Sequence, residues 1–497
     1  MSVPVKEAAS STSDAPVRSL SLLDSICIIV GTIIGSGIFG TTPLIAANTT
    51  GPSQLLWVWV LGGAVAMTGA LCFAELMTRF PGAIGGDYVY LKRAFGLPAG
   101  FTFAWVAFWI IRPGNIGAMA MIFSQYFVEI VGGGSTGQVA FALLAVVGLS
   151  FTNLIGLRSG KVVQNVLTIA KVAGIGLIVL LAVVKTPPAE VQATQSGSDA
   201  VQVQTDDAEV DSNSDGGSSN DEEKESSPKF WFAMVLIMFT YGGWNDIAFV
   251  AGEVKRPERN LVRSIIFGTA AVMVIYLAIN WAFLHMLGYD GVTGSTAVAT
   301  DFTKTAFGPE TTWGTRSSQL VAALICISCL GAINGMILTS PRIYFSLGRD
   351  IKPLAFLARL NMRRDAPWQA IILQAVITIG LILLCLRYTN AFGVILAVTA
   401  PYFWGFLGAT VLSLLVFRYS RTRKDDSSTS TAPIFKVPLF PLPALFFAAV
   451  CGAMAWSSIQ HVIEERYTTV AVIVLSTMVV GVFAAFILSS RKYRSVE

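Results

Sequence analysis

The chain has 497 residues, of which 54% are hydrophobic and only 13% are charged, and its mean hydropathy is +0.65. This composition excludes an ordinary soluble enzyme and gives no reason to expect a nucleic-acid partner; it predicts an all-α polytopic membrane protein. The net charge of +4 excludes little by itself, because the side of the membrane on which the positive residues lie matters more than their sum.

Twelve apolar segments are long enough to cross a bilayer, at roughly 20 residues each. Lys and Arg gather in alternate connections, for example at Arg79, Arg158 and Lys255, and the connections between carry few. By the positive-inside rule, both termini are therefore expected to be cytoplasmic. A short amphipathic connector over 80–96 is expected on the surface. The predicted spans are 22–47, 55–78, 99–130, 138–157, 162–184, 230–252, 262–287, 318–346, 367–386, 391–417, 437–457 and 468–489.

The first span is apolar but rich in glycine, with Ser36 at its middle. Gly35 and Gly37 flank this serine, and each glycine costs a helix roughly 1 kcal/mol relative to alanine. We expect the helix to break here. The half-helix that begins near Ile38 would then direct free N–H groups at an anion such as a carboxylate. The alternative is an unbroken helix whose glycines form a packing face for a neighbour.

The sixth span contains a second interruption, Phe239-Thr-Tyr-Gly-Gly-Trp-Asn-Asp246. Interrupted helices at matching positions of two halves indicate an inverted-repeat transporter with a site at the middle of the membrane. We therefore expect a first repeat over 20–185, with spans 1–5, and a second over 229–419, with spans 6–10. Spans 11 and 12 occupy 436–490.

Four segments lie outside the predicted spans and repeats. A polar tail over 1–19 is expected to be disordered and cytoplasmic. The loop over 186–228 is rich in Asp, Glu and Ser, so it is expected to be disordered and extracytoplasmic, either as an insertion or as a segment that gathers cations. A cytoplasmic linker over 420–435 and a tail over 491–497 complete the chain.

Lys171 lies ten residues into the fifth span, where its insertion costs about 2.5–3.5 kcal/mol and it is expected to serve a function. Its ammonium could hold the broken first span by donating to freed carbonyls, could stand where cation-coupled relatives hold sodium, or could carry a proton. The alternative is a lysine in a cytoplasmic water cavity.

Other polar and aromatic residues within spans have two readings each. Arg112 needs a partner or water and is interpreted as structural. Asp246 follows the second break and could cap the helix there or act in gating. Phe239, Trp244, Phe403 and Trp404 could line an apolar pocket or simply pack. No catalytic, cofactor-binding or metal-binding constellation is found, so neither an enzyme nor a cofactor or metal is expected.

Several motifs resemble those of the amino acid–polyamine–organocation superfamily and, more narrowly, its L-type amino acid transporter branch. They cover about residues 20–490 except the acidic loop. The motifs are Gly31-Thr-Ile-Ile-Gly-Ser-Gly-Ile-Phe39, Gly85-Gly-Asp-Tyr88, Ile111-Arg-Pro113, Tyr241-Gly-Gly-Trp-Asn245, Arg256-Pro-Glu-Arg-Asn-Leu261, Ser328-Cys-Leu-Gly-Ala-Ile-Asn-Gly335 and Lys436-Val-Pro-Leu439.

The resemblance implies a leucine-transporter-type fold of twelve helices, ten of them in a 5+5 inverted repeat with helices 1 and 6 broken. It implies that backbone N–H groups at the first break hold a substrate carboxylate and that carbonyls at both breaks hold its ammonium. It also implies an aromatic gate, a side-chain pocket and a lysine in place of sodium. The amides correspond to Ser36, Gly37 and Ile38, and the carbonyls to Ile33, Phe239 and Gly242. The aromatic gate corresponds to Phe239, the side-chain pocket to Asn245, and the lysine to Lys171.

One departure concerns a partner. Heteromeric relatives carry a cysteine between spans 3 and 4 that bonds a heavy chain, whereas the loop 132–137 here has none. The sequence therefore predicts a stand-alone carrier in the cell membrane, in a bacterial inner membrane by expectation. It would move a neutral, bulky apolar L-amino acid as an exchanger or a proton-coupled symporter. The alternative is an amino acid sensor that keeps the site but does not transport.

Overall fold

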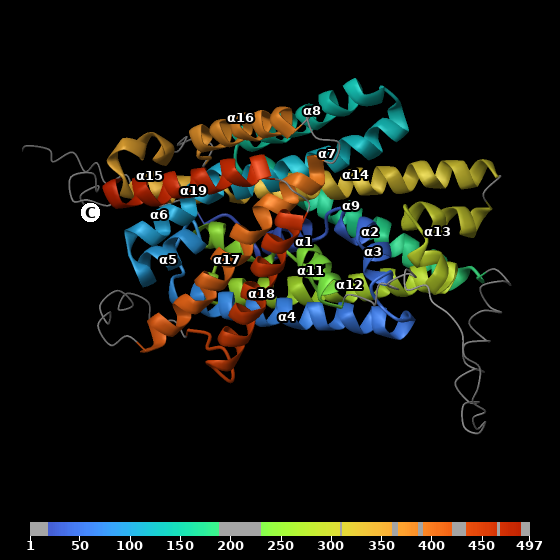
Figure 1. The fold of residues 1–497 in the computed structure, drawn as a ribbon, viewed down its shortest axis with the longest axis horizontal. Helices are drawn as coiled ribbons and strands as arrows, with labels where there is room; N and C mark the ends of the chain where they lie inside the picture. Colours follow the sequence, from blue (N-terminus) through green and yellow to red (C-terminus); the bar gives the residue numbers. More distant parts are fainter. Residues whose placement is uncertain are drawn as a thin grey trace, which may run out of the picture.

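The computed structural model describes residues 18–187, 230–308, 311–359, 366–385, 391–419, 434–464 and 468–488. Over these residues the chain is helical, apart from turns and isolated bridge residues, which include the parallel pair Leu20 and Val254. Most helices run along the long axis of the molecule, and α17 (Ala391–Tyr419) and α18 (Leu442–Glu464) lie obliquely across them (Figure 1).

The helices before the acidic loop are α1 (Leu22–Ile33), α2 (Gly37–Gly40), α3 (Thr42–Ala46), α4 (Pro52–Arg79), α5 (Asp87–Phe95), α6 (Leu97–Val106), the π-helix η1 (Ala107–Ile111), α7 (Arg112–Val131), α8 (Gly134–Ile155) and α9 (Leu157–Val184). Those after it are α11 (Phe230–Thr240), the 3-10 helix η2 (Trp244–Glu253), α12 (Pro257–Thr293), α13 (Val298–Phe307), α14 (Thr312–Thr339), α15 (Pro341–Asp350), the 3-10 helix η3 (Lys352–Ala358), α16 (Trp368–Cys385), α17, α18 and α19 (Thr468–Leu488).

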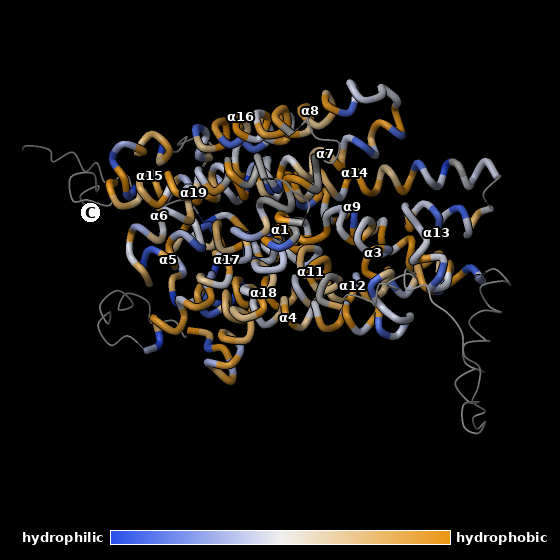
Figure 2. The backbone as a smooth tube through the Cα atoms, viewed as in Figure 1, coloured by the Kyte–Doolittle hydropathy of each residue, from blue (hydrophilic) through white to orange (hydrophobic). Residues whose placement is uncertain are grey.

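Ten helical segments in the described ranges are long and apolar enough to cross a membrane. Two shorter apolar stretches, Trp368–Leu384 and Leu475–Leu488, correspond to the ninth and twelfth predicted spans. Hydrophobic residues occupy long stretches of most helices (Figure 2). On α9, for example, Val166 and Ile169 are 60% and 59% exposed, which suits contact with lipid rather than water. The chain is therefore a polytopic all-α membrane protein.

Helix α1 lies at the centre of the bundle, in contact with α9, α12, α14 and η2. A capping box begins it: the Ser21 hydroxyl accepts from the Asp24 amide, and the Asp24 carboxylate accepts from the Ser21 amide. The carboxylate also contacts Lys161 Nζ at 3.2 Å and accepts from Asn165 of α9 at 2.7 Å. These contacts fix where α1 starts, and so where its far end meets the neighbouring helices.

The connector over 80–96 is packed more deeply than predicted. In its helix α5, Asp87, Tyr88, Tyr90 and Leu91 are buried, and Phe95 at the end is 48% exposed. The amphipathic pattern arises because Lys92 pairs with Asp350 of α15 at 2.6 Å and does not simply face water. The connector is thus packed into the end of the bundle that carries α15 (Figure 1).

The predicted tails, the acidic loop and the linker fall largely outside the described residues. Where the N-terminal segment is described, it binds the bundle: the amides of Ser19 and Leu20 both donate to the carbonyl of Glu253 at 2.9 Å. The amide of Lys255 donates back to the carbonyl of Leu20 at 2.8 Å. The chain before α1 is therefore attached to the end of η2.

Candidate functional site

The first predicted break is present. Helix α1 ends at Ile33, α2 begins at Gly37, and the residues between them are not helical. Among the described residues, no acceptor is found for the amides of Ser36, Gly37 and Ile38. Successive main-chain N–H groups without acceptors at a helix start are a type of arrangement that can bind an anion.

The second predicted break is also present, but its second half differs from a continued α-helix. Helix α11 ends at Thr240, and η2 resumes at Trp244 as a 3-10 helix. Between them, Gly243 has φ +112°, and a Cβ there would lie 3.2 Å from both the carbonyl carbon and oxygen of Thr32. Only glycine meets both requirements, the left-handed backbone and the close approach to α1.

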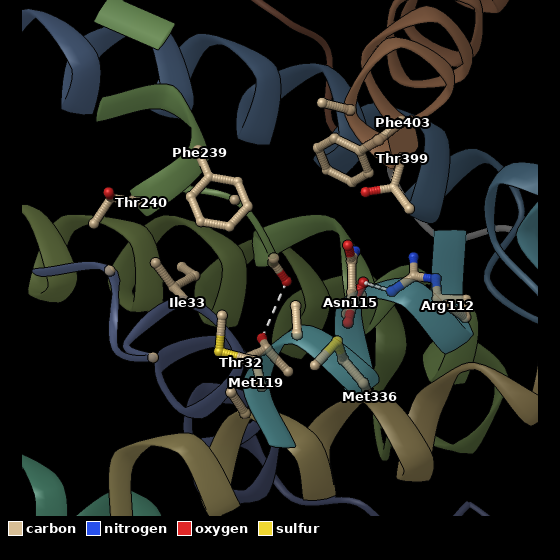
Figure 3. A pocket seen from close by; sticks show the side chains of 18 of the residues that line it. Thr32, Ile33, Arg112, Asn115, Met119, Phe239, Thr240, Met336, Thr399 and Phe403 are labelled. Carbon is tan, nitrogen blue, oxygen red and sulfur yellow. Dashed lines mark hydrogen bonds and ion pairs between the residues drawn. The ribbon is translucent and has the colours of Figure 1, made fainter. Parts of the chain in front are cut away.

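Side chains join the two breaks. The Thr32 hydroxyl donates to the Gly243 carbonyl at 3.1 Å, a bond drawn in Figure 3. The Tyr276 hydroxyl, from α12, lies 3.1 Å from the carbonyl oxygen of Ile33 and 3.0 Å from that of Thr240. One phenol therefore serves a freed carbonyl of each broken helix, so the two breaks are held in a fixed relation.

Lys171 supports the first break from α9. Its Nζ donates to the carbonyls of Gly31 at 2.9 Å and Ile34 at 2.6 Å, both at the end of α1. The third bond goes to the carbonyl of Ser328 of α14, at 2.9 Å. The ammonium is fully buried and uses all three of its protons. Of the readings left open by the sequence, the donation to freed carbonyls is the one observed.

A cavity lies between the breaks and helices α7, α14 and α17. Figure 3 shows Phe239 and Phe403 at one side of it, and Met119 and Met336 at the other. Four predicted site residues line it: Ile33, Gly37, Phe239 and Gly242. Ser36 and Ile38 adjoin Gly37 in the chain and contribute the amides described above. Other residues that line the cavity are Thr32, Arg112, Asn115, Thr240, Asp246, Thr399 and Trp404.

An ion pair closes one end of the cavity. Arg112 Nη1 donates to Asp246 Oδ1 at 2.8 Å, and both side chains are almost fully buried. The guanidinium also lies over the Phe249 ring, 4.6 Å from its centroid. The interpretation of Asp246 as a helix cap is wrong, because η2 is preceded by Gly243 and has no side-chain cap. Asp246 is instead the partner that Arg112 requires.

A second, smaller cavity lies beside the first and shares Arg112 and Phe403 with it. Asn245 lines this smaller cavity, 3.5 Å from the carboxylate of Asp87 through its Nδ2. Burial raises the pKa of the Asp87 carboxyl to about 7, although the Arg112 guanidinium opposes the shift. Asn245 is thus separated from the four cavity-lining residues predicted with it.

Several residues of this region were not found from the sequence. Tyr276 gives no local signal, because a tyrosine within a span is usually a packing residue. Asp87 belongs to a recognisable motif, but its burial depends on the docking of α5. Thr240 gives no local signal either: its hydroxyl lies 3.0 Å from that of Thr41, the residue that follows α2. These roles depend on which helices become neighbours in the fold, and the local sequence around each residue does not specify that.

A family model described as amino acid permease matches residues 20–485. Among curated proteins, the b(0,+)-type amino acid transporter 1 of Mus musculus is 30% identical over 452 residues, which cover 90% of this chain and 85% of the relative. The serine/threonine exchanger SteT of Bacillus subtilis (strain 168) is 27% identical, with 86% of this chain and 90% of the relative covered. The large neutral amino acids transporter small subunit 2 of Rattus norvegicus is 28% identical, with coverages of 87% and 75%.

Proposed function

The chain belongs to the amino acid permease family, in the L-type branch of the amino acid–polyamine–organocation superfamily, and we propose that it moves a neutral L-amino acid across the membrane by alternating access. The family is one of transporters and not of enzymes. The paired breaks are the observation that carries the proposal, because they offer main-chain donors and acceptors a short distance apart in an apolar surrounding.

The substrate's carboxylate binds the amides of Ser36, Gly37 and Ile38, which have no described acceptor of their own. Its ammonium binds carbonyls at the two breaks, from Ile33, Phe239 and Gly242. This arrangement recognises the part that all amino acids share, a zwitterion, and leaves the side chain free to extend into the rest of the cavity. Phe239 covers the substrate as a gate.

The rest of the cavity favours a neutral, bulky side chain. Met119, Met336, Phe403 and Trp404 give it apolar walls. The two ionic groups that reach it, Arg112 and Asp246, neutralise each other, so a charged substrate side chain would meet no unpaired counter-charge. Asn115 adds a polar position among these walls. Asn245 contributes from the adjoining cavity, through contact with Asp87.

The proposed architecture is twelve transmembrane helices, with spans 1–5 and 6–10 in a 5+5 inverted repeat. The carrier lies in the plasma or inner membrane of the cell, with both termini in the cytoplasm. Lys171 takes the place of a bound cation and couples the hinge of α1 to α14. The loop 132–137 holds no cysteine, which supports action without a disulfide-linked heavy chain. Exchange and proton-coupled symport both remain compatible with this scheme.

The experiment is transport by the purified chain in liposomes. Preloaded and empty vesicles are offered each proteinogenic L-amino acid in labelled form, with protein-free vesicles as the control. We expect uptake of large neutral amino acids at least into preloaded vesicles. If no amino acid enters under either condition, the proposal fails. Saturable binding without any flux would instead favour a sensor built on the same scaffold.

A further inference from the structure

We propose that the Asp87 carboxyl is a proton-binding site, and that its protonation is coupled to the substrate cycle through η2 and the Arg112–Asp246 pair. This inference rests on the proposed transport function. It adds a co-substrate, the proton, and the residue that receives it.

The first argument is charge balance. Arg112 is the cation beside two carboxyl groups, those of Asp246 and Asp87, and it is bound directly to Asp246 at 2.8 Å. Asp87 is 3% exposed, and the neutral side chains of Asn245, at 3.5 Å, and Thr410 are its hydrogen-bonding neighbours. Its Oδ1 has no hydrogen-bond partner among the described residues. If both carboxyls were ionised, the cluster would bury an uncompensated negative charge, which is costly; one bound proton removes it.

The second argument is that, among the described residues, Arg112 is the one cation that acts on Asp87, and Lys92 of the same helix is paired with Asp350. Helix α5 packs against α6, α15 and α17. Helix α6 has no ionisable residue, and α17 presents the neutral Thr410. Tyr90, on α5 itself, is buried with an unpartnered hydroxyl, and burial raises its pKa. Tyr344 of α15 donates to the Ala107 carbonyl at 3.3 Å, and Arg342 of the same helix is paired with Glu253.

The third argument is mechanical. The Gly85 amide donates to the Phe249 carbonyl of η2 at 2.9 Å, and a Cβ on Gly86 would lie 3.0 Å from the carbonyl carbon of Ala248. The segment that carries Asp87 is therefore seated directly on η2, the second half of the broken sixth helix. Any change that undocks α5 to hydrate the carboxylate also frees η2, which bears Asp246 at the wall of the cavity.

The direction of the pH effect follows from linkage. Burial raises the pKa of Asp87 to about 7 in the docked arrangement, whereas a hydrated aspartate titrates near pH 4. The docked arrangement therefore binds the proton more tightly. Its stabilisation by the proton is complete below the hydrated pKa and is lost as the pH rises through about 7. Entry from an acidic outside, followed by undocking at a less acidic inside, would move one proton with each substrate.

The test uses the full chain in liposomes, with the amino acid that is exchanged fastest in the panel above and with pyranine in the lumen to report its pH. In the wild type, an inward proton gradient should drive uptake into empty vesicles and acidify the lumen as substrate enters. Asp87→Asn should lower gradient-driven uptake by about tenfold or more, a typical coupling factor. Exchange into preloaded vesicles should survive in this variant, because its neutral side chain mimics the protonated form.

Two further variants keep the test decisive. Asp350→Asn removes an acidic contact of α5, the partner of Lys92, without touching Asp87; it should retain the gradient dependence. Asp87→Glu should retain coupling with a shifted pH midpoint. The inference is overturned if wild-type uptake moves no protons while exchange proceeds, or if Asp87→Asn responds to the gradient like the wild type. Absence of exchange by the wild type at every pH would instead refute the transport function itself.

Discussion

Lys171 donates to two carbonyls at the end of α1, those of Gly31 and Ile34, and the second also lies 3.1 Å from the Ser328 hydroxyl. A lysine so deep in a span is costly, and three charge-assisted hydrogen bonds offset that cost. The position is crowded: a Cβ on Gly331 of α14 would lie 2.7 Å from Nζ and 2.9 Å from Cε. The ammonium therefore depends on a glycine of another helix for its place.

Gly331→Ala should displace Lys171 from at least one carbonyl and slow amino acid exchange by about fivefold or more, in proportion to one lost hydrogen bond of about 1 kcal/mol. Gly176→Ala is the matched control, because it lies on α9 and its added Cβ would meet nothing within 4 Å. Initial exchange rates in liposomes would measure both. Equal rates for the two variants would mean that the position of the ammonium is not critical.

The second break requires glycine at position 243, because Gly243 has φ +112° and lies against the main chain of Thr32. Gly243→Ala should destabilise the protein by about 1–3 kcal/mol, the cost of a strained backbone position. A lowered melting temperature in detergent would report this loss. Gly40→Ala should leave the melting temperature unchanged, because nothing lies within 4 Å of its added Cβ; a comparable loss there would contradict the argument.

At the scale of elements, the two broken helices behave as one unit because α12 and α7 hold them. Tyr276 of α12 bonds to both breaks, and Arg112 of α7 pairs with η2. The Arg112–Asp246 pair lies at the wall of the cavity, and Tyr276 holds the carbonyls of Ile33 and Thr240, two residues that also line it. The effect of these contacts is to fix the distance between the amides of one break and the carbonyls of the other.

Tyr276→Phe removes the hydroxyl that serves both carbonyls. We expect substrate affinity to fall by about threefold to tenfold, consistent with an interhelical hydrogen bond of roughly 1 kcal/mol. Equilibrium binding of labelled substrate to the purified variant would measure it. Tyr419→Phe is the control, since that side chain is 67% exposed at the end of α17. Unchanged affinity in Tyr276→Phe would show that the breaks are positioned by other contacts.

The Arg112–Asp246 pair permits a double-mutant cycle. Arg112→Gln alone leaves a buried carboxylate without its partner and should cost about 3–5 kcal/mol of stability. Asp246→Asn alone should be similarly harmful. The double variant should recover part of the loss, because no lone charge remains. Thermal unfolding of the three variants would test this, and strict additivity of the two single effects would contradict a direct pair.

At the scale of the whole molecule, charge distribution predicts which end faces the cytoplasm. Helices α13 and α15 lie at opposite ends of the bundle (Figure 1). Thr296, just before α13, and Lys352, just after α15, are both exposed. A cysteine in place of Thr296 should react with an impermeant maleimide added outside intact cells. One in place of Lys352 should react only after permeabilisation. The reverse pattern would invert the topology.

Features that depend on local chemistry could be predicted from the sequence. The glycines beside Ser36 indicate a helix break, and the isolated charge of Lys171 indicates a functional residue. Both raise the free energy of a membrane helix unless a specific interaction offsets the cost. The pairing of Arg112 with Asp246 and the burial of Asp87 were not predictable in this way. They depend on which helices become neighbours, and one sequence does not specify that. The connector was misplaced for the same reason: Lys92 indicated a solvated face until its partner Asp350 on α15 was known.

The attachment of Leu20 to Val254 bears on biogenesis. Leu20 leaves the ribosome before the first span, whereas its partner is synthesised only after the fifth span and the acidic loop. This contact therefore cannot form while the first half of the chain is being inserted. Translation must proceed through η2 before the amino-terminal segment can bind there, so a nascent chain stalled earlier would leave that segment exposed to proteases.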